Sequence, residues 1–407
     1  MTQTPLDAFP PELSTPDRRL RPGPVYASLH DEGPVRYDET RECWDVVGHA
    51  AVERVAADPE RFSSRPATDP ANDPLDGSTL LGESLLHVDP PRHERLRSVV
   101  DEWFRPSELD PLRSFVTTRA DELLDTALTE GDSLGSDAAD AGGHGEARFD
   151  LVSAFAYPLT VATLAELLGV PTSEREAFSE WTRFTATAPH EPSDPGALRS
   201  RLQTYLGELV DGERDAEDSD VLRVIRAATD RSTTERRSLA TVILLGGLST
   251  THLIDNAIWS LAEADALARV RGDDDAVQAA VEETLRHRSP VRAAARYATT
   301  ETELAGHTVA AGDHLCLWFG AANRDPSVFA APAEFDLDRN PSRHVAFGHG
   351  LHYCLGAALA RLVARVALTR LLARCEPLTV HTDELEPTGS MLVYGPSILP
   401  VTVGRST

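Results

Sequence analysis

The sequence predicts a mainly α-helical protein with small β-sheets, an α+β fold. Two observations lead to this class. Segments in which apolar residues recur with helical periodicity outweigh segments that alternate, and the longest of them runs from about Glu235 to Ala264. Strand-like alternation is confined to short pieces, such as "CWDVVG" near the N-terminus and residues 302–319. No long linker divides the chain, so we expect a single domain over residues 1–407.

The first half of the chain mixes both element types. Strand-like "GPVRYDE" and "CWDVVG" precede the helical "HAAVERVAAD". Residues 131–147 are rich in glycine, alanine and aspartate and indicate a flexible surface insertion. Residues 150–170 have helical periodicity, whereas the proline-rich residues 186–197 are expected to form a loop.

The second half contains the clearest elements. After the long helix, another helix is expected at about 276–287, followed by strands within 302–319 that turn at a glycine in 311–313. A last helix is expected from Leu355 to about Cys375. Its apolar residues form one stripe: Leu355, Leu359, Leu362, Val363, Val366, Leu371 and Leu372.

Composition argues against several classes of protein. The formal net charge is −26, and all 39 basic residues are arginine. This negative field repels phosphates, so we expect no nucleic-acid partner. Without a long apolar run or an apolar N-terminal segment, we expect a cytoplasmic protein with no membrane span. The acidic, lysine-free composition is typical of a high-salt cytoplasm, with GC-rich codon bias as the alternative.

The stretch "FGHGLHYCLG", residues 347–356, places a thiol just before the last helix. Three interpretations are open. A zinc site could draw on His344, His349, His352 and Cys354, but the sequence offers no second ligand cluster at knuckle spacing. A catalytic thiol would need a base, which nothing marks. A buried structural cysteine is the common case. The glycines and the helix start instead favour a thiolate, which suits an axial ligand of iron.

The same stretch resembles the haem-binding signature of the cytochrome P-450 family, FGxGxHxCxG, at every signature position, including Phe347, Gly348 and Gly356. The resemblance implies the cytochrome P-450 fold, with haem b between the long central helix and the cysteine-bearing loop. It implies that Cys354 ligates the haem iron. It also implies that His352 contacts a haem propionate.

Two further stretches resemble the family and imply more propionate contacts. "DPPRHERLR", residues 89–97, supplies His93 and Arg97, and "SPVRAAARYAT", residues 289–299, supplies Arg296. The implied roles are chemically sound, because arginine donates to carboxylates in bidentate geometry.

A structural ion-pair network is implied by two other motifs. "EETLR" has the family's ExxR pattern at Glu283 and Arg286, which share a helix face at i, i+3 spacing. "AANRDPSVFAAPAEFDLDR", residues 321–339, resembles the family's ANRDPxxF…FDxxR stretch and offers Arg339 as the third member.

The long helix contains "LLGGLSTTHLIDN", which resembles the family's oxygen-activation motif [AG]-G-x-[DE]-T. Gly246 and Gly247 match its small residues and Thr250 its threonine, so Thr250 is expected to orient a proton-donating water. Ser249 replaces the usual acid. A serine hydroxyl can only pass protons along a hydrogen-bonded chain, so we expect water-mediated, slower proton delivery through Ser249 and Thr250. A second departure is Val363, where the family often has glutamate, and is expected to affect packing only.

The resemblance implies a haem-thiolate monooxygenase that takes electrons from a ferredoxin-type partner and inserts one atom of O2 into a small or medium apolar substrate. We expect a monomer. The alternatives are a peroxide-driven or non-oxygenating enzyme and a non-catalytic haem-binding or sensor protein. Candidate partner contacts near Cys354 are Arg343, His344, Arg361 and Arg365. Candidate substrate-lining positions are Leu244, Gly247, Leu248, Val291, Ala293 and Ala294, with segments 75–87 and 184–190.

Overall fold

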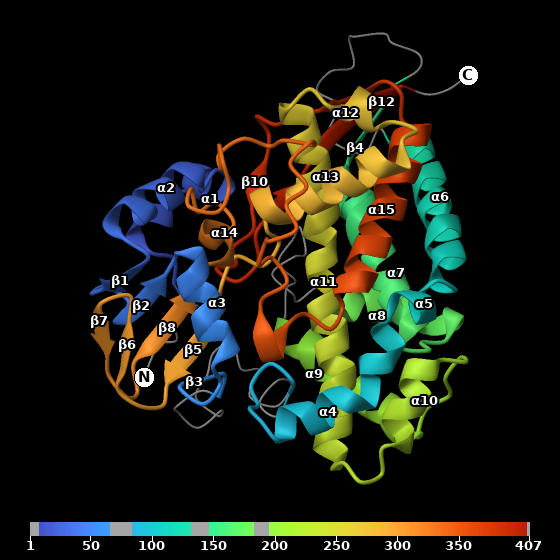
Figure 1. Cartoon of the computed structure of the whole chain (residues 1–407). Helices are drawn as coiled ribbons and strands as arrows, with labels where there is room; N and C mark the ends of the chain where they lie inside the picture. The colour runs from blue at the N-terminus through green and yellow to red at the C-terminus, as the bar shows by residue number, and fades with distance from the viewer. Residues whose placement is uncertain (1–7, 66–83, 132–145, 183–194, 405–407) are drawn as a thin grey trace.

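The 31-residue helix α11 (Thr233–Glu263) runs through the middle of the molecule and organises the fold (Figure 1). The computed structural model describes residues 8–65, 84–131, 146–182 and 195–404. A capping box begins α11: the Ser232 hydroxyl accepts a hydrogen bond from Glu235 N, and the Glu235 carboxylate accepts one from Ser232 N. At 1.5 Å per residue the helix is about 46 Å long.

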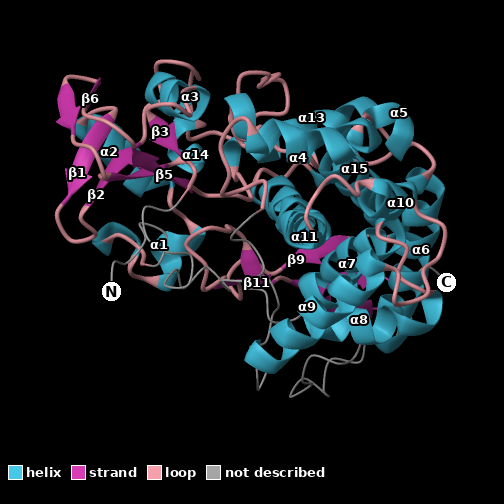
Figure 2. Ribbon diagram, turned by 90° about the horizontal axis from the view of Figure 1, so that it is seen from below, coloured by secondary structure: helices cyan, strands magenta, loops and turns pink. Residues whose placement is uncertain are grey.

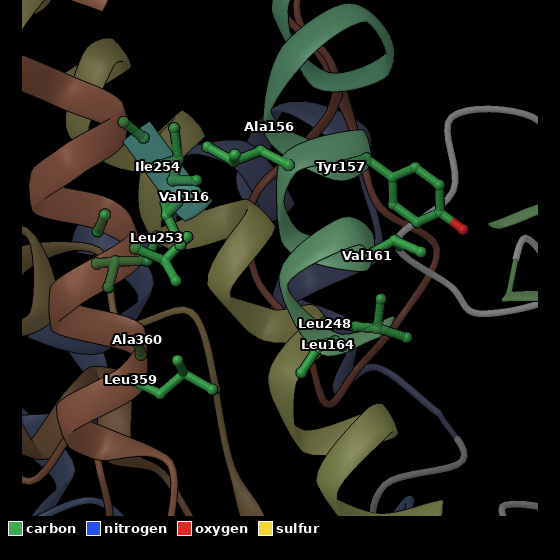
Figure 3. Close-up of a cluster of buried hydrophobic side chains, with 14 of the residues drawn as sticks. Val116, Ala156, Tyr157, Val161, Leu164, Leu248, Leu253, Ile254, Leu359 and Ala360 are labelled. Carbon is green, nitrogen blue, oxygen red and sulfur yellow. The ribbon is translucent and has the colours of Figure 1, made fainter. Parts of the chain in front are cut away.

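Four long helices pack directly on α11: α7 (Tyr157–Leu167), α9 (Pro195–Asp211), α13 (Asp274–His287) and α15 (Ala357–Arg374). A fifth, α6 (Leu112–Glu130), packs on α7 and α15. Their apolar faces form one continuous core, and Figure 3 shows side chains of α7, α11 and α15 within it. The shorter helices of this part are α4 (Arg92–Val100), α5 (Pro106–Leu109), α8 (Arg175–Trp181), α10 (Asp220–Ala227) and α12 (Leu267–Val270).

A five-stranded sheet forms the other side of the molecule, at the left of Figure 1. Its strand order is β1-β2-β8-β5-β3, and only β2 and β8 run parallel. The strands are β1 (Val35–Asp38), β2 (Cys43–Val46), β3 (Phe62–Ser63), β5 (Ala294–Ala298) and β8 (His314–Leu317). The helices α2 (Gly23–Glu32), α3 (His49–Ala57) and α14 (Phe319–Ala322) lie beside this sheet, and α1 (Pro16–Leu20) precedes them.

Three smaller sheets complete the described structure. β4 (Glu146–Asp150), β12 (Pro400–Gly404) and β9 (Leu378–Val380) form an antiparallel sheet at the end of the helical part. β10 (Glu386–Pro387) pairs with β11 (Pro396–Ile398), and β6 (Thr302–Leu304) forms a hairpin with β7 (His307–Val309). Figure 2, coloured by secondary structure, shows how far helices outweigh strands.

The expected fold class and most expected elements are confirmed, with three local corrections. Residues 150–170 are helical only over 151–167: β4 ends at Asp150, a π-helical turn spans Val152–Ala156, and α7 follows it without a break and ends at Leu167. Residues 195–197, expected in a loop, begin α9, because a proline is tolerated at the first helical position. The strands within 302–319 turn twice, at Gly306 as well as at Gly312. Most of the expected insertion at 131–147 lies outside the described residues.

Helix α11 is long and apolar enough to cross a membrane by length and composition. However, 78% of its apolar window is buried inside the molecule, as expected for a core helix. The described residues therefore give no support to a membrane-spanning role for α11.

Candidate active site

Cys354 lies in the short loop that precedes α15. Its backbone N–H donates to Phe347 O at 2.8 Å, which closes the loop on itself. The loop needs glycine at Gly350, where φ is +67° and a Cβ would lie 2.8 Å from Ala56 O of α3. Cys354 is partly exposed, whereas the other three cysteines are buried. Burial raises the pKa of the Cys354 thiol, while a hydrogen bond from the Gly356 backbone N–H and the charges of Arg97 and Arg361 oppose that shift.

Four basic side chains gather beside the cysteine loop from three elements. His93 and Arg97 come from α4, Arg296 from β5, and His352 from the loop itself. The His93 and His352 rings meet edge to face, with centroids 4.5 Å apart. Arg97 Nη1 donates to Tyr353 O at 2.6 Å, so α4 is fastened to the residue next to Cys354. The structure therefore brings together all four residues that the sequence assigned to propionates.

Three of these basic groups, His93, Arg296 and His352, have lowered pKa values. Burial, with the nearby charge of Arg97, lowers the pKa of His93 to about 4, and burial lowers that of Arg296 to about 10. Burial, with the charges of Arg296 and His93, lowers the pKa of His352 to about 3. The His93 Nδ1 atom is buried and has no hydrogen-bond partner among the described residues. Such a cluster of basic side chains, two of them buried, fits a group that carries carboxylates.

Sequence reasoning missed two residues that support this cluster. The Ser64 hydroxyl and His352 Nε2 are 2.7 Å apart, and the Asp89 carboxylate accepts hydrogen bonds from Ser63 Oγ and from Ser64 N, the latter at 3.0 Å. Asp89 also provides the favourable charge near Arg296. Asp89 stood in the quoted "DPPRHERLR" stretch, but the sequence carries no signal that joins it to Ser64, which is distant in the chain.

On α11, Gly246 and Gly247 face different environments. A Cβ built on Gly246 would meet no atom within 4 Å among the described residues. A Cβ on Gly247 would lie 2.4 Å from Leu164 Cδ2 of α7. Leu164 and Leu248 lie close together at this α7–α11 contact (Figure 3). Among the described residues, the open approach to α11 is therefore at Gly246, whereas Gly247 packs against Leu164 of α7. That Gly247 lies at the reaction site stays a prediction.

Thr250 is buried and lies one helical turn after Gly246, so both face the same side of α11. Ser249 is partly exposed, and its hydroxyl donates to its own helix, to Gly246 O at 2.9 Å. This bond occupies the only proton that the serine side chain can donate. The structure thus provides a threonine next to an open face and no carboxyl group at position 249.

The Glu283–Arg286–Arg339 network forms as expected and is buried. Arg286 donates from Nε to Glu283 Oε2 at 2.9 Å and from Nη2 to Glu283 Oε1 at 2.7 Å, and Arg339 Nε reaches Glu283 Oε1 at 3.1 Å. Arg286 also donates to the carbonyl oxygens of Asn323, Pro332 and Glu334. It therefore ties α13 to the chain segment that leads into the cysteine loop.

The neighbouring Glu282 binds two of the basic residues expected to meet a redox partner. His344 Nε2 lies 3.1 Å from Glu282 Oε2, and Arg361 donates to Glu282 Oε1 at 2.6 Å and to Oε2 at 3.0 Å. Burial alone would raise the pKa of Glu282, but these hydrogen bonds and charges lower it to about 2. Arg365 donates to Gln278 at 3.2 Å, and Arg343 is exposed. Glu282 of α13 thus engages two of the four candidate contacts, His344 and Arg361, while Arg343 and Arg365 are not paired with a carboxylate of this helix.

The alternative zinc site gains no support. No group of three or more His, Cys, Asp or Glu residues that could hold a metal ion occurs in the part of the chain that the structure describes. Two of its expected ligands are engaged elsewhere, His344 with Glu282 and His352 with Ser64. A haem, which needs a single protein thiolate on iron and basic groups for its propionates, fits the residues present.

The expected substrate-lining positions divide into two groups. Leu244, Leu248 and Ala293 are buried in hydrophobic clusters. Val291 and Ala294 are partly exposed at the edge of another cluster, and Val291 bridges to Val393 near the C-terminus. Segment 184–190 and residues 75–83 lie outside the described residues.

Comparisons with known proteins agree with this geometry. A family model of cytochrome P450 matches residues 275–399, which include the Glu283 network and the Cys354 loop. Cytochrome P450 monooxygenase PikC of Streptomyces venezuelae is 35% identical over 98% of this chain and 96% of its own length. The chain belongs to the cytochrome P450 family. Cytochrome P450 109 of Bacillus spizizenii is 33% identical over 96% of this P450 and 94% of its own length.

Solved P450 structures share the fold. The structure of CYP109E1 from Bacillus megaterium in complex with testosterone superimposes with a TM-score of 0.80 and 30% identity, covering 95% of this chain and 99% of that one. The hydroxylase HmtN gives a TM-score of 0.80 and 32% identity, covering 94% and 97%. This chain is therefore a P450 monooxygenase, and the family implies a haem-thiolate cofactor.

Proposed function

We propose that this P450 monooxygenase inserts one oxygen atom from O2 into a C–H or C=C bond of a small or medium apolar substrate. Cys354 would ligate the iron of haem b, and His93, Arg97, Arg296 and His352 would hold its propionates. When bound, the haem activates O2, with the thiolate favouring O–O cleavage. The observation that carries the proposal is the partly exposed Cys354 beside four basic side chains that converge from α4, β5 and the cysteine loop.

The chain's own residues would supply orientation and protons. Thr250 lies on the same face as the open approach at Gly246, so its hydroxyl is suited to hold a water molecule at the reaction site. The hydroxyl of Ser249 is bonded to its own helix and offers no acid.

The substrate class rests on the apolar candidate lining positions and on relatives. CYP109E1 was solved in complex with testosterone and with corticosterone, and a relative from Pseudonocardia autotrophica is a vitamin D(3) 25-hydroxylase. Medium-sized apolar ring compounds are therefore the first substrates to test. Compounds that shift the haem absorption spectrum would be followed by product analysis.

A ferredoxin-type protein would deliver the electrons to a monomeric, cytoplasmic enzyme, docking near Cys354. Arg343 is exposed there, whereas His344 and Arg361 share the charge of Glu282. Arg343 and Arg365 would offer cations for docking, so we expect electron transfer from an acidic partner to slow as the salt concentration rises. Peroxide-driven oxidation is the second candidate, favoured by the missing acid at Ser249; turnover with peroxide alone and none with a ferredoxin system would establish it.

The deciding experiment is the carbon monoxide difference spectrum of the reduced, haem-loaded protein. We expect the red-shifted Soret band of a thiolate-ligated haem in the unchanged protein and its loss in Cys354→Ala. The control Cys375→Ala should keep the band, because it removes a buried thiol at the other end of α15. A folded, haem-loaded protein without that band would contradict the proposed function.

A further inference from the structure

The chain from the end of α13 to β5 carries several buried arginines, and one of them differs from the others. Arg286 is paired with Glu283, and Arg288 is paired with Glu263. Arg292 is 1% exposed, yet it forms no ion pair with a carboxylate in the part of the chain that the structure describes. Its Nε and Nη1 atoms also have no hydrogen-bond partner there. The charge of Arg292 is therefore left unbalanced by the described residues.

The guanidinium group of Arg292 cannot escape burial by losing its proton, because arginine stays charged in proteins. Water could accept its hydrogen bonds but could not supply a negative charge. Buried charges are paired, and an unpaired one is strongly destabilising. The sequence has 65 acidic residues, and none of those that the structure describes is paired with Arg292. An anion from solution would supply the missing charge.

Aromatic rings and a second arginine surround Arg292. Its guanidinium carbon lies 4.9 Å from the centre of the Tyr394 ring and 5.6 Å from the centre of the Phe9 ring. Burial raises the pKa of Tyr26, and the charges of Arg292 and Arg324 oppose this shift, so both guanidinium groups lie near the Tyr26 hydroxyl. Arg324 donates to a backbone carbonyl oxygen and, within the described ranges, to no carboxylate. The surroundings are therefore positive and largely apolar.

The hydroxyl of Tyr26 can add a donor to this environment. A Cβ on Gly320 would lie 2.8 Å from Tyr26 Oη, so the hydroxyl rests on the backbone of α14. Gly320 N in turn donates to Arg292 O at 3.2 Å, which brings α14 against the same arginine. The hydroxyl of Tyr394 is engaged elsewhere, because it donates to Leu20 O at 2.7 Å. Tyr26 is thus the hydroxyl that can face the same anion as Arg292.

We propose that Arg292 and Tyr26 bind a small monovalent anion, of which chloride is the common case, as a structural ligand of the fold. The occupant is small because the guanidinium group is buried and is flanked by the rings of Phe9 and Tyr394. The anion would join α2, through Tyr26, to the segment before β5, through Arg292. The inference does not depend on the proposed function.

Urea unfolding of the whole haem-loaded protein at constant ionic strength tests the site. Sodium chloride is exchanged stepwise for sodium gluconate, whose anion is too large to replace a buried halide. A ligand that binds only the folded state raises the folding equilibrium constant about tenfold for each tenfold rise in concentration above its Kd. We expect this slope in the unchanged protein and none in Arg292→Gln. No slope in the unchanged protein, or an equal slope in both, would overturn the proposal.

Two further variants separate the site from a merely structural effect. Arg288→Gln is the matched control, because Arg288 is buried nearby but has its own carboxylate; it should lower stability and keep the chloride slope. Asp7, outside the described residues, is the carboxylate closest in sequence to Phe9, and Asp7→Asn should leave the slope unchanged. If Asp7→Asn instead destabilises the protein as much as Arg292→Gln and chloride has no effect, the chain supplies its own counter-charge and the proposal is wrong.

A crystal of the unchanged protein grown in sodium bromide locates the ion without any variant. Anomalous scattering should place bromide within hydrogen-bond distance of the Arg292 guanidinium and of Tyr26 Oη. A water molecule or a carboxylate of the chain in that position would contradict the proposal. Bromide found there without a chloride slope in solution would mean an adventitious ion only, and would equally overturn it.

Discussion

Removal of the Glu283 carboxylate should destabilise the protein strongly. Its two oxygens accept four hydrogen bonds, from Arg286 Nε and Nη2, Arg339 Nε and Asp336 N, at 2.7 to 3.1 Å. Glu283→Gln keeps the shape but leaves Arg286, which has no exposed side-chain surface, without a counter-charge. Breaking such a buried pair costs about 3–5 kcal/mol. That is a large part of the roughly 5–15 kcal/mol by which proteins are stable.

Urea unfolding, followed by the fluorescence of the buried Trp259 and Trp318, measures this loss in the free energy of unfolding. The control is Glu122→Gln on α6, whose pair with Arg119 at 3.0 Å is exposed and should contribute no more than about 1 kcal/mol. If Glu283→Gln costs no more than the control, the network does not hold the segment before the cysteine loop, and the reasoning fails.

Three further predictions concern α11 and α13. Ser249→Asp should raise coupled turnover, and an unchanged product yield per electron pair would show that the missing acid is not limiting. Because the pKa of Glu282 falls from 4.5 to about 2 on folding, its contribution to stability is present above pH 4.5 and is lost toward pH 2. Unfolding of Glu282→Gln should therefore depend less on pH in this window, and an identical dependence would refute the assignment. Gly247→Ala should cost about 1–3 kcal/mol in thermal or urea unfolding by overpacking against Leu164, whereas Gly246→Ala should cost nothing. The reverse order would contradict the orientation of α11.

The parts of the molecule that the sequence predicted well are those governed by local pattern. The helix of residues 235–264 and the last helix were found within a few residues, because their apolar stripes and caps lie within each segment. The Glu283–Arg286 pair follows directly from helical spacing. The resemblance to the P450 family also indicated which distant basic residues would meet.

The parts that the sequence could not predict depend on contacts between distant segments. Gly246 and Gly247 are adjacent and chemically identical, and only the position of Leu164 on α7 shows which one is packed. The bond between Ser64 and His352 joins residues 288 positions apart. Likewise, Glu282 differs from Glu283 only in the side of α13 that it faces, yet it binds His344 and Arg361. Tertiary packing decides each of these, and no periodicity reports it.

Glu282 and Glu283 are consecutive on α13 and bind the chain on both sides of Cys354. Glu282 binds His344 before the cysteine and Arg361 after it. Glu283 binds Arg339, further before the cysteine, and Arg286 of α13 itself. The position of the cysteine loop therefore depends on α13 as well as on the residues around Cys354. A substitution on that helix, outside the loop, would displace the iron ligand from a distance.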